Sequence, residues 1–77
     1  MYKTYSMKQA NVIYRASKEG HITISKQVMS KIYDMADESC EYFFDGYDMH
    51  ERIPMIVQNI FDGNYKMAQQ GIDEIAA

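Results

Sequence analysis

The residues of this chain with the clearest chemical potential are carboxylates that recur at helical spacing. Five of them lie between positions 34 and 45: Asp34, Asp37, Glu38, Glu41 and Asp45. Steps of three and four residues place side chains on one face of an α-helix, so we expect a single line of charge, called here the acidic ridge. The ridge would span about 17 Å with one negative charge about every 4 Å. One strand of DNA carries a phosphate about every 3.4 Å. This similarity predicts a contact surface for a protein partner that is basic or binds nucleic acid.

Three further residues extend the predicted partner-binding surface: Tyr42, Tyr47 and Asp48. Tyrosine is enriched at protein interfaces, because its ring is rigid and amphipathic. Two simpler interpretations stay open. The ridge is also typical of a solvated helix face, and the tyrosines could instead cap the core. Each pair of like charges at these spacings destabilises the helix by about 0.2–0.5 kcal/mol.

A second candidate surface is basic and belongs to the first predicted helix. Lys8, Asn11, Arg15 and Lys18 recur at spacings of three and four, and could contact phosphates and a base edge. A helix-turn-helix would place its recognition residues on the second helix, which here carries the acids. We therefore do not expect direct nucleic-acid binding, and a small DNA-binding regulator that uses this face is the alternative function.

Charge is divided unevenly along the chain. Residues 1–31 carry six basic side chains against one acidic, and residues 32–77 carry two against ten, giving a net charge of −3.

The sequence gives little support for catalytic or metal chemistry. His21 and His50 have no partners at metal-ligand spacing, and the single cysteine, Cys40, cannot form an internal disulfide. No phosphate-binding loop or nucleophile motif is present. We expect a protein that is not an enzyme, with no catalytic residue, metal or cofactor.

The apolar pattern predicts an all-α fold of four helices in a single domain, residues 1–77. The expected helices cover 7–19, 26–44, 53–61 and 65–76, and the last two form a C-terminal αα-hairpin. Ser6 and Gln9 have the form of a capping box, Ser25 is typical of an N-cap, and Gly20 and Gly63 are typical helix stops. Pro54 favours a helix that begins near residue 53, after an irregular turn. The predicted inward stripe of the first helix contains Met7, Ala10, Ile13, Tyr14 and Ser17.

Two resemblances add to these expectations. Residues 63–68 resemble the G-x-Y-x-x-A turn of a tetratricopeptide hairpin, which implies two antiparallel helices there. In size, acidity and lack of catalytic motifs, the chain resembles the small phage-encoded inhibitors of bacterial defence, such as anti-CRISPR proteins and DNA mimics. That resemblance implies an inhibitor in the bacterial cytoplasm. No segment is apolar enough for a membrane span, and a homodimer is compatible with the sequence.

Overall fold

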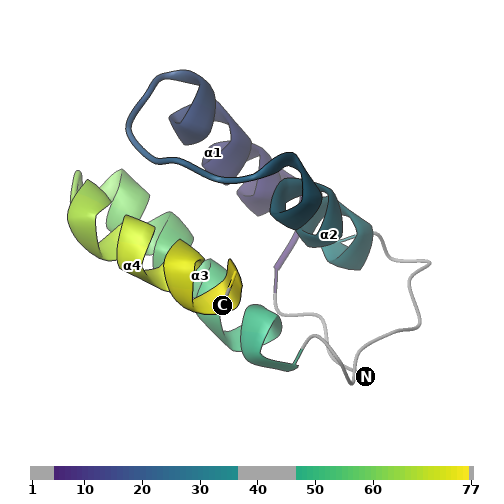
Figure 1. Cartoon of the computed structure of the whole chain (residues 1–77). Helices are drawn as coiled ribbons and strands as arrows, with labels where there is room; N and C mark the ends of the chain where they lie inside the picture. The colour runs from purple at the N-terminus through teal and green to yellow at the C-terminus, as the bar shows by residue number, and fades with distance from the viewer. Residues whose placement is uncertain (1–4, 37–46, 77) are drawn as a thin grey trace.

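The four predicted helices are present in the computed structural model, which describes residues 5–36 and 47–76, and only the backbone of 47–50. They are α1 (Met7–Lys18), α2 (Lys26–Ala36), α3 (Tyr47–Phe61) and α4 (Tyr65–Ala76). No strand occurs among the described residues. Helix α1 packs against both α2 and α3, and α4 packs against α3 as the second arm of the hairpin (Figure 1). The all-α fold and its C-terminal αα-hairpin are confirmed.

The start of α1 follows from a local motif. The Ser6 Oγ accepts a hydrogen bond from the Gln9 backbone N–H at 3.4 Å, and the Ser6 N–H donates to Gln9 Oε1 at 2.9 Å. These two bonds complete the predicted capping box and satisfy backbone groups that have no partner within the helix. Ser25 begins α2 in a similar way, because its Oγ accepts from the Val28 N–H at 3.2 Å.

Two glycines end helices with the same geometry. Gly20 (φ 84°) and Gly63 (φ 75°) both adopt the left-handed conformation. The N–H of Gly63 donates to the Ile60 carbonyl and that of Asn64 to the Asn59 carbonyl, and equivalent bonds surround Gly20. These are Schellman motifs, which need a residue without a Cβ at the turn. Both predicted helix ends are therefore confirmed.

The prediction for the start of α3 was wrong. The helix begins at Tyr47 rather than near residue 53, so Pro54 lies inside it and Asp48 lies in its first turn. A proline removes one backbone hydrogen bond, but its fixed φ is compatible with a helix. Burial of Ile53, Ile56 and Val57, all at most 3% exposed, offsets that loss. For α2, residues 37–44 of the predicted range lie outside the described residues.

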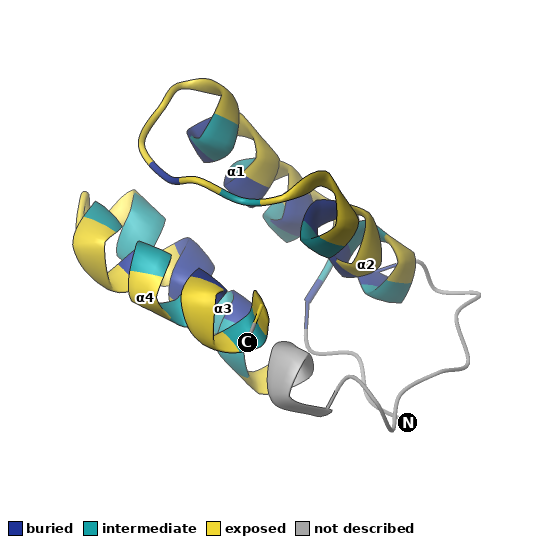
Figure 2. Cartoon of the chain, viewed as in Figure 1, coloured by how far each residue is buried: buried dark blue, intermediate teal, exposed yellow. Residues whose placement is uncertain are grey.

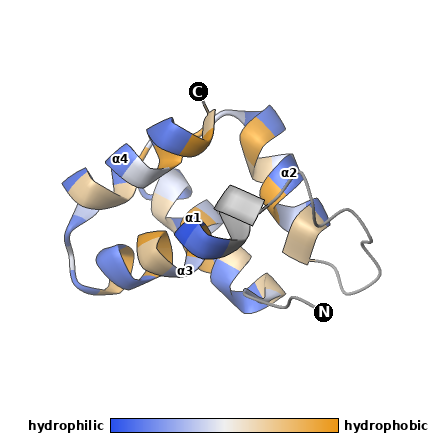
Figure 3. Cartoon of the chain, turned by 90° about the horizontal axis from the view of Figure 1, so that it is seen from below, coloured by the Kyte–Doolittle hydropathy of each residue, from blue (hydrophilic) through white to orange (hydrophobic). Residues whose placement is uncertain are grey.

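The core is apolar and is shared by all four helices. Each helix carries hydrophobic and hydrophilic residues in alternation (Figure 3), and buried positions alternate with exposed ones along α1 (Figure 2). The predicted stripe of α1 was partly wrong: Ala10, Ile13 and Ala16 are buried, whereas Met7 and Tyr14 are almost half exposed. The buried face is set by where α2 and α3 contact α1, and residues 7 and 14 lie on its flank.

Two core residues of the described part of the chain lie outside the helices. Tyr5 is 3% exposed, and its hydroxyl donates to the Ile32 carbonyl of α2 at 2.9 Å. Ile22, in the connector between α1 and α2, is 4% exposed. Thus both segments that flank α1 are packed into the domain.

Candidate functional site

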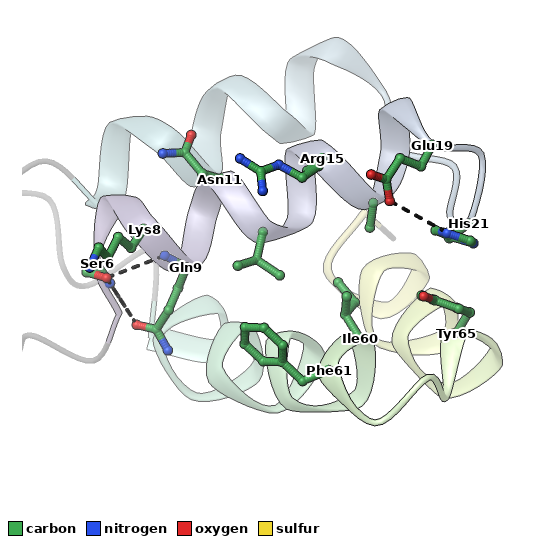
Figure 4. A pocket seen from close by; sticks show the side chains of 12 residues that line it. Ser6, Lys8, Gln9, Asn11, Arg15, Glu19, His21, Ile60, Phe61 and Tyr65 are labelled. Atoms are coloured by element: carbon green, nitrogen blue, oxygen red, sulfur yellow. Dashed lines mark hydrogen bonds and ion pairs between the residues drawn. The ribbon is translucent and has the colours of Figure 1, made fainter.

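The described structure contains an open groove of about 610 Å³ between α1 and the junction of α3 with α4. Side chains of α1 form one wall, and Ile60 and Phe61 of α3 form the other (Figure 4). His21 and Tyr65 lie at one end. Its volume falls within the range of about 300–1,000 Å³ that is usual for ligand sites.

Helix α1 supplies a wall that is basic at its rim and apolar beneath. Lys8, Val12 and Arg15 recur at spacings of four and three, so they share one side of the helix. Ala16, next to them, is buried, while Lys8 and Arg15 are exposed. The capping box fixes where α1 begins, and the packing of α1 against α3 decides which of its residues face the groove.

The opposite wall exposes an aromatic side chain. Phe61 is 69% exposed, and it points with Ile60 from the last turn of α3 toward α1 (Figure 4). It is the last residue of α3 before the turn at Gly63. Together with Ile60 and Val12 it forms an apolar patch in the groove, and contiguous apolar patches are typical of contact surfaces.

The end of the groove at His21 and Tyr65 contains two stacked rings and a carboxylate. The rings of His21 and Tyr65 are parallel within 4°, with centroids 4.1 Å apart. The Glu19 carboxylate lies 3.6 Å from His21 Nε2. The connector that carries His21 is fastened to α4, because the Thr23 N–H donates to Gln69 Oε1 at 2.7 Å and Gln69 Nε2 donates to the Thr23 carbonyl at 2.9 Å.

The structure separates the four residues of the predicted basic surface. Lys8, Asn11 and Arg15 line the groove. The Lys18 ammonium instead lies over the Tyr14 ring, 5.7 Å from its centroid. Within the described residues, Lys8 and Arg15 form no ion pair, so their charges are available to a ligand.

Asn11 is already engaged at the edge of the groove. Its Oδ1 accepts a hydrogen bond from the Tyr33 hydroxyl of α2 at 2.5 Å. Burial raises the pKa of Tyr33, with a smaller contribution from Tyr14, whose ring meets that of Tyr33 edge-on at 6.3 Å. Asn11 thus links α1 to α2 and has less capacity left for a base edge.

The acidic ridge is only partly covered by the structure. Asp34 is exposed on α2. Four ridge residues and one tyrosine lie outside the described residues: Asp37, Glu38, Glu41, Asp45 and Tyr42. Tyr47 and Asp48 lie in the first turn of α3, where the structure describes the backbone alone. The ridge therefore stays a prediction from sequence.

A smaller groove of about 150 Å³ lies between α3 and α4 on another surface. Met55 and Met67 are 66% and 52% exposed there. An ion pair between Arg52 and Glu74 joins the two helices beside it. Its volume is below the range of about 300–1,000 Å³ that is usual for ligand sites.

Sequence reasoning missed Phe61 and the pairing of His21 with Tyr65. Phe61 directly precedes the Asp62-Gly63 stop, and an aromatic residue at that position was a usable signal of exposure. The stack joins residues 44 positions apart in the sequence, and no local pattern could predict it. In the described part of the chain, no three His, Cys, Asp or Glu side chains are grouped to hold a metal ion.

No helix in residues 5–36 or 47–76 has the length and apolar character needed to cross a bilayer.

Comparison with known proteins identifies no relative. No protein-family model, curated protein or solved structure matches this chain.

Proposed function

We propose that this protein is a non-enzymatic module that binds another protein through the groove between α1 and α3. The observation that carries the proposal is Phe61, 69% exposed on one wall of a groove whose floor is apolar. Protein interfaces are built around such aromatic anchors, surrounded by polar and charged side chains. Lys8 and Arg15 supply the charged rim here.

Charge favours a protein over a nucleic acid as the ligand. Nucleic-acid sites neutralise several phosphates along a backbone. This groove offers two cations, contains Glu19, and has the exposed Asp62 next to Phe61. The whole chain is also acidic, with a net charge of −3. A polyanion would be repelled, whereas a peptide with a few local carboxylates would not.

The acidic ridge remains part of this proposal as a second contact surface. Its support is the spacing of the carboxylates in the sequence, together with the exposure of Asp34 on α2. Its partner would be basic or would bind nucleic acid. The narrower role of a phage-encoded inhibitor in a bacterial cytoplasm rests on resemblance in class, and none of the comparisons supports it.

The proposal is tested by quantitative capture of partners on the immobilised full chain, run in parallel with variants. Phe61→Ala should lower the affinity for a true partner by roughly 30-fold, because truncating an aromatic anchor costs about 2 kcal/mol or more. Met55→Ala is the matched control, since Met55 is equally exposed but lies outside the groove.

A ridge variant in the same experiment separates the two surfaces. Reversing Asp37, Glu38 and Glu41 to Lys should abolish binding if the ridge is the contact surface and leave it intact if the groove acts alone. Failure of the unmodified chain to retain any protein above the level of the Phe61→Ala and ridge variants would contradict protein binding. Tight and salt-sensitive binding to duplex DNA would favour the alternative regulator.

A further inference from the structure

We infer that the groove accepts an amphipathic helical segment of the partner that carries two carboxylates about two helical turns apart. This inference rests on the proposed protein-binding function and specifies the chemistry of the ligand. It follows from the placement of charge, apolar surface and aromatic rings along one side of α1.

The two free cations set the spacing of the carboxylates. Lys8 and Arg15 are seven residues apart on α1, so they lie on the same side of the helix and about 10.5 Å apart along its axis. Both are exposed, and neither is neutralised by an ion pair within the described residues. A helix lying along α1 would match them with acidic residues at positions i and i+7.

The surface between the cations is partly apolar, with Gln9 and Asn11 at its edge. Val12 lies between Lys8 and Arg15 on α1, and Ile60 and Phe61 face it from α3 (Figure 4). Helix-in-groove recognition uses apolar anchors at i, i+3, i+4 and i+7 on the bound segment. The partner segment should therefore carry aliphatic or aromatic residues between its two carboxylates, in contact with Phe61.

Glu19, at one end of the groove, determines the order of charged residues along the ligand. Glu19 lies four residues beyond Arg15, and its carboxylate would repel a third acid on the ligand. A basic residue is favoured there instead. The order along the ligand is then acid near Lys8, apolar residues, acid near Arg15, and a base near Glu19.

The ligand pattern is tested with a displayed library on a fixed helical scaffold, selected against the immobilised full chain. The two outer positions, i and i+7, and the two positions between them on the same face, i+3 and i+4, are randomised. We expect enrichment of Asp or Glu at both outer positions and of large apolar residues between them. Recovery of no binders, or of binders without acidic outer positions, would overturn the inference.

A sharper test reverses the charges of the groove and measures the affinity of the best selected peptide by fluorescence anisotropy. The double variant Lys8→Glu/Arg15→Glu should weaken binding by about tenfold or more, as expected for charges that face each other across an interface. A peptide whose two acids are replaced by Lys should bind the double variant better than the unmodified protein. This rescue cannot arise from misfolding.

A matched control uses the remaining cation of α1. Lys18→Glu changes the charge by the same amount per residue, but its ammonium lies over Tyr14 and outside the groove. It should weaken peptide binding clearly less than Arg15→Glu does, because Lys18 does not line the groove. An effect equal to that of Arg15→Glu would mean that binding responds to net charge alone, and would contradict the inference.

Three other outcomes would contradict this assignment. If NMR chemical-shift changes on addition of the peptide map to Met55 and Met67, the ligand site proposed here is refuted, while protein binding as such is not. A single-stranded oligonucleotide that displaces the peptide at equal concentration would overturn the proposal in favour of nucleic acid. Self-association in sedimentation experiments that is lost in the Lys8→Glu/Arg15→Glu variant would assign the groove to a second copy. Failure of both the library and the partner capture would reject the proposed function itself.

Discussion

The hydroxyl of Tyr33 connects two helices through one side-chain hydrogen bond. It donates to Asn11 of α1 from α2, and the Tyr14 ring lies beside it. Burial raises the pKa of Tyr33, so the neutral phenol is favoured in the folded state. Because the folded protein holds this proton more tightly than the unfolded chain does, the free energy of unfolding does not depend on Tyr33 ionisation well below the ordinary tyrosine pKa of about 10. The free energy of unfolding then falls as the pH rises through about 10 and beyond.

Tyr33→Phe should therefore act in two ways. At neutral pH it removes the bond to Asn11 and should lower the free energy of unfolding by about 0.5–1.5 kcal/mol. Above about pH 10 the difference from the unmodified protein should shrink, because the ionised phenol no longer stabilises the fold. Urea unfolding at both pH values measures this. Tyr65→Phe is the control, since its hydroxyl makes no hydrogen bond in the described part of the chain. A difference that stays constant with pH would contradict the argument.

Between elements, the closest approach occurs in the α3–α4 hairpin. A Cβ added at Gly71 would lie 2.6 Å from Cγ1 of Ile56, whose side chain is buried. Glycine in the middle of a helix costs about 1 kcal/mol relative to alanine. The hairpin accepts that cost because the backbones of α3 and α4 can then pack closely.

Gly71→Ala should destabilise the protein even though alanine favours the helix. Overpacking costs about 1–3 kcal/mol, and the gain in helix propensity offsets about 1 kcal/mol of it. A net loss of up to about 2 kcal/mol is expected in thermal or urea unfolding. Gln70→Ala, at the adjacent exposed position, should change stability by less than about 0.5 kcal/mol. An increase in stability from Gly71→Ala would show that the hairpin has room for the methyl group.

Helix boundaries were predictable where their cause is local. Ser6, Gly20 and Gly63 act through hydrogen bonds within five residues, so their types alone identified the ends of helices. Pro54 misled because its effect depends on tertiary burial, which a local pattern does not contain. The flank position of Tyr14 was missed for the same reason: the arrangement of α2 and α3 decides which side of α1 is buried.

At the scale of the whole molecule, the groove was not predictable as a site. Lys8 and Arg15 could be identified from the sequence as exposed cations, but Phe61, His21 and Tyr65 join them only through packing. The connector after α1, which brings His21 to one end of the groove, is fastened to α4 by Gln69, across 46 positions of the sequence. Tertiary contacts of that separation leave no periodic signal.

Gln69→Ala should loosen that connection and weaken the whole domain. It removes two hydrogen bonds to the Thr23 backbone, worth about 0.5–1.5 kcal/mol each. Amide exchange at Thr23 should accelerate more than exchange within α1, and the melting temperature should fall. Lys66→Ala, an exposed residue of the same helix, should change neither. Unchanged exchange at Thr23 would mean that Ile22 alone holds the connector.

The same fastening has a consequence for synthesis on the ribosome. Proteins are made from the N-terminus, and α4 is the last of the four helices to leave the exit tunnel. Until it does, Gln69 cannot bind Thr23, and Ile56 of α3 lacks its contact with α4 at Gly71. The first three helices must therefore emerge with part of their apolar surface uncovered, and the nascent chain completes its fold only after the helix that contributes Gln69 has been translated.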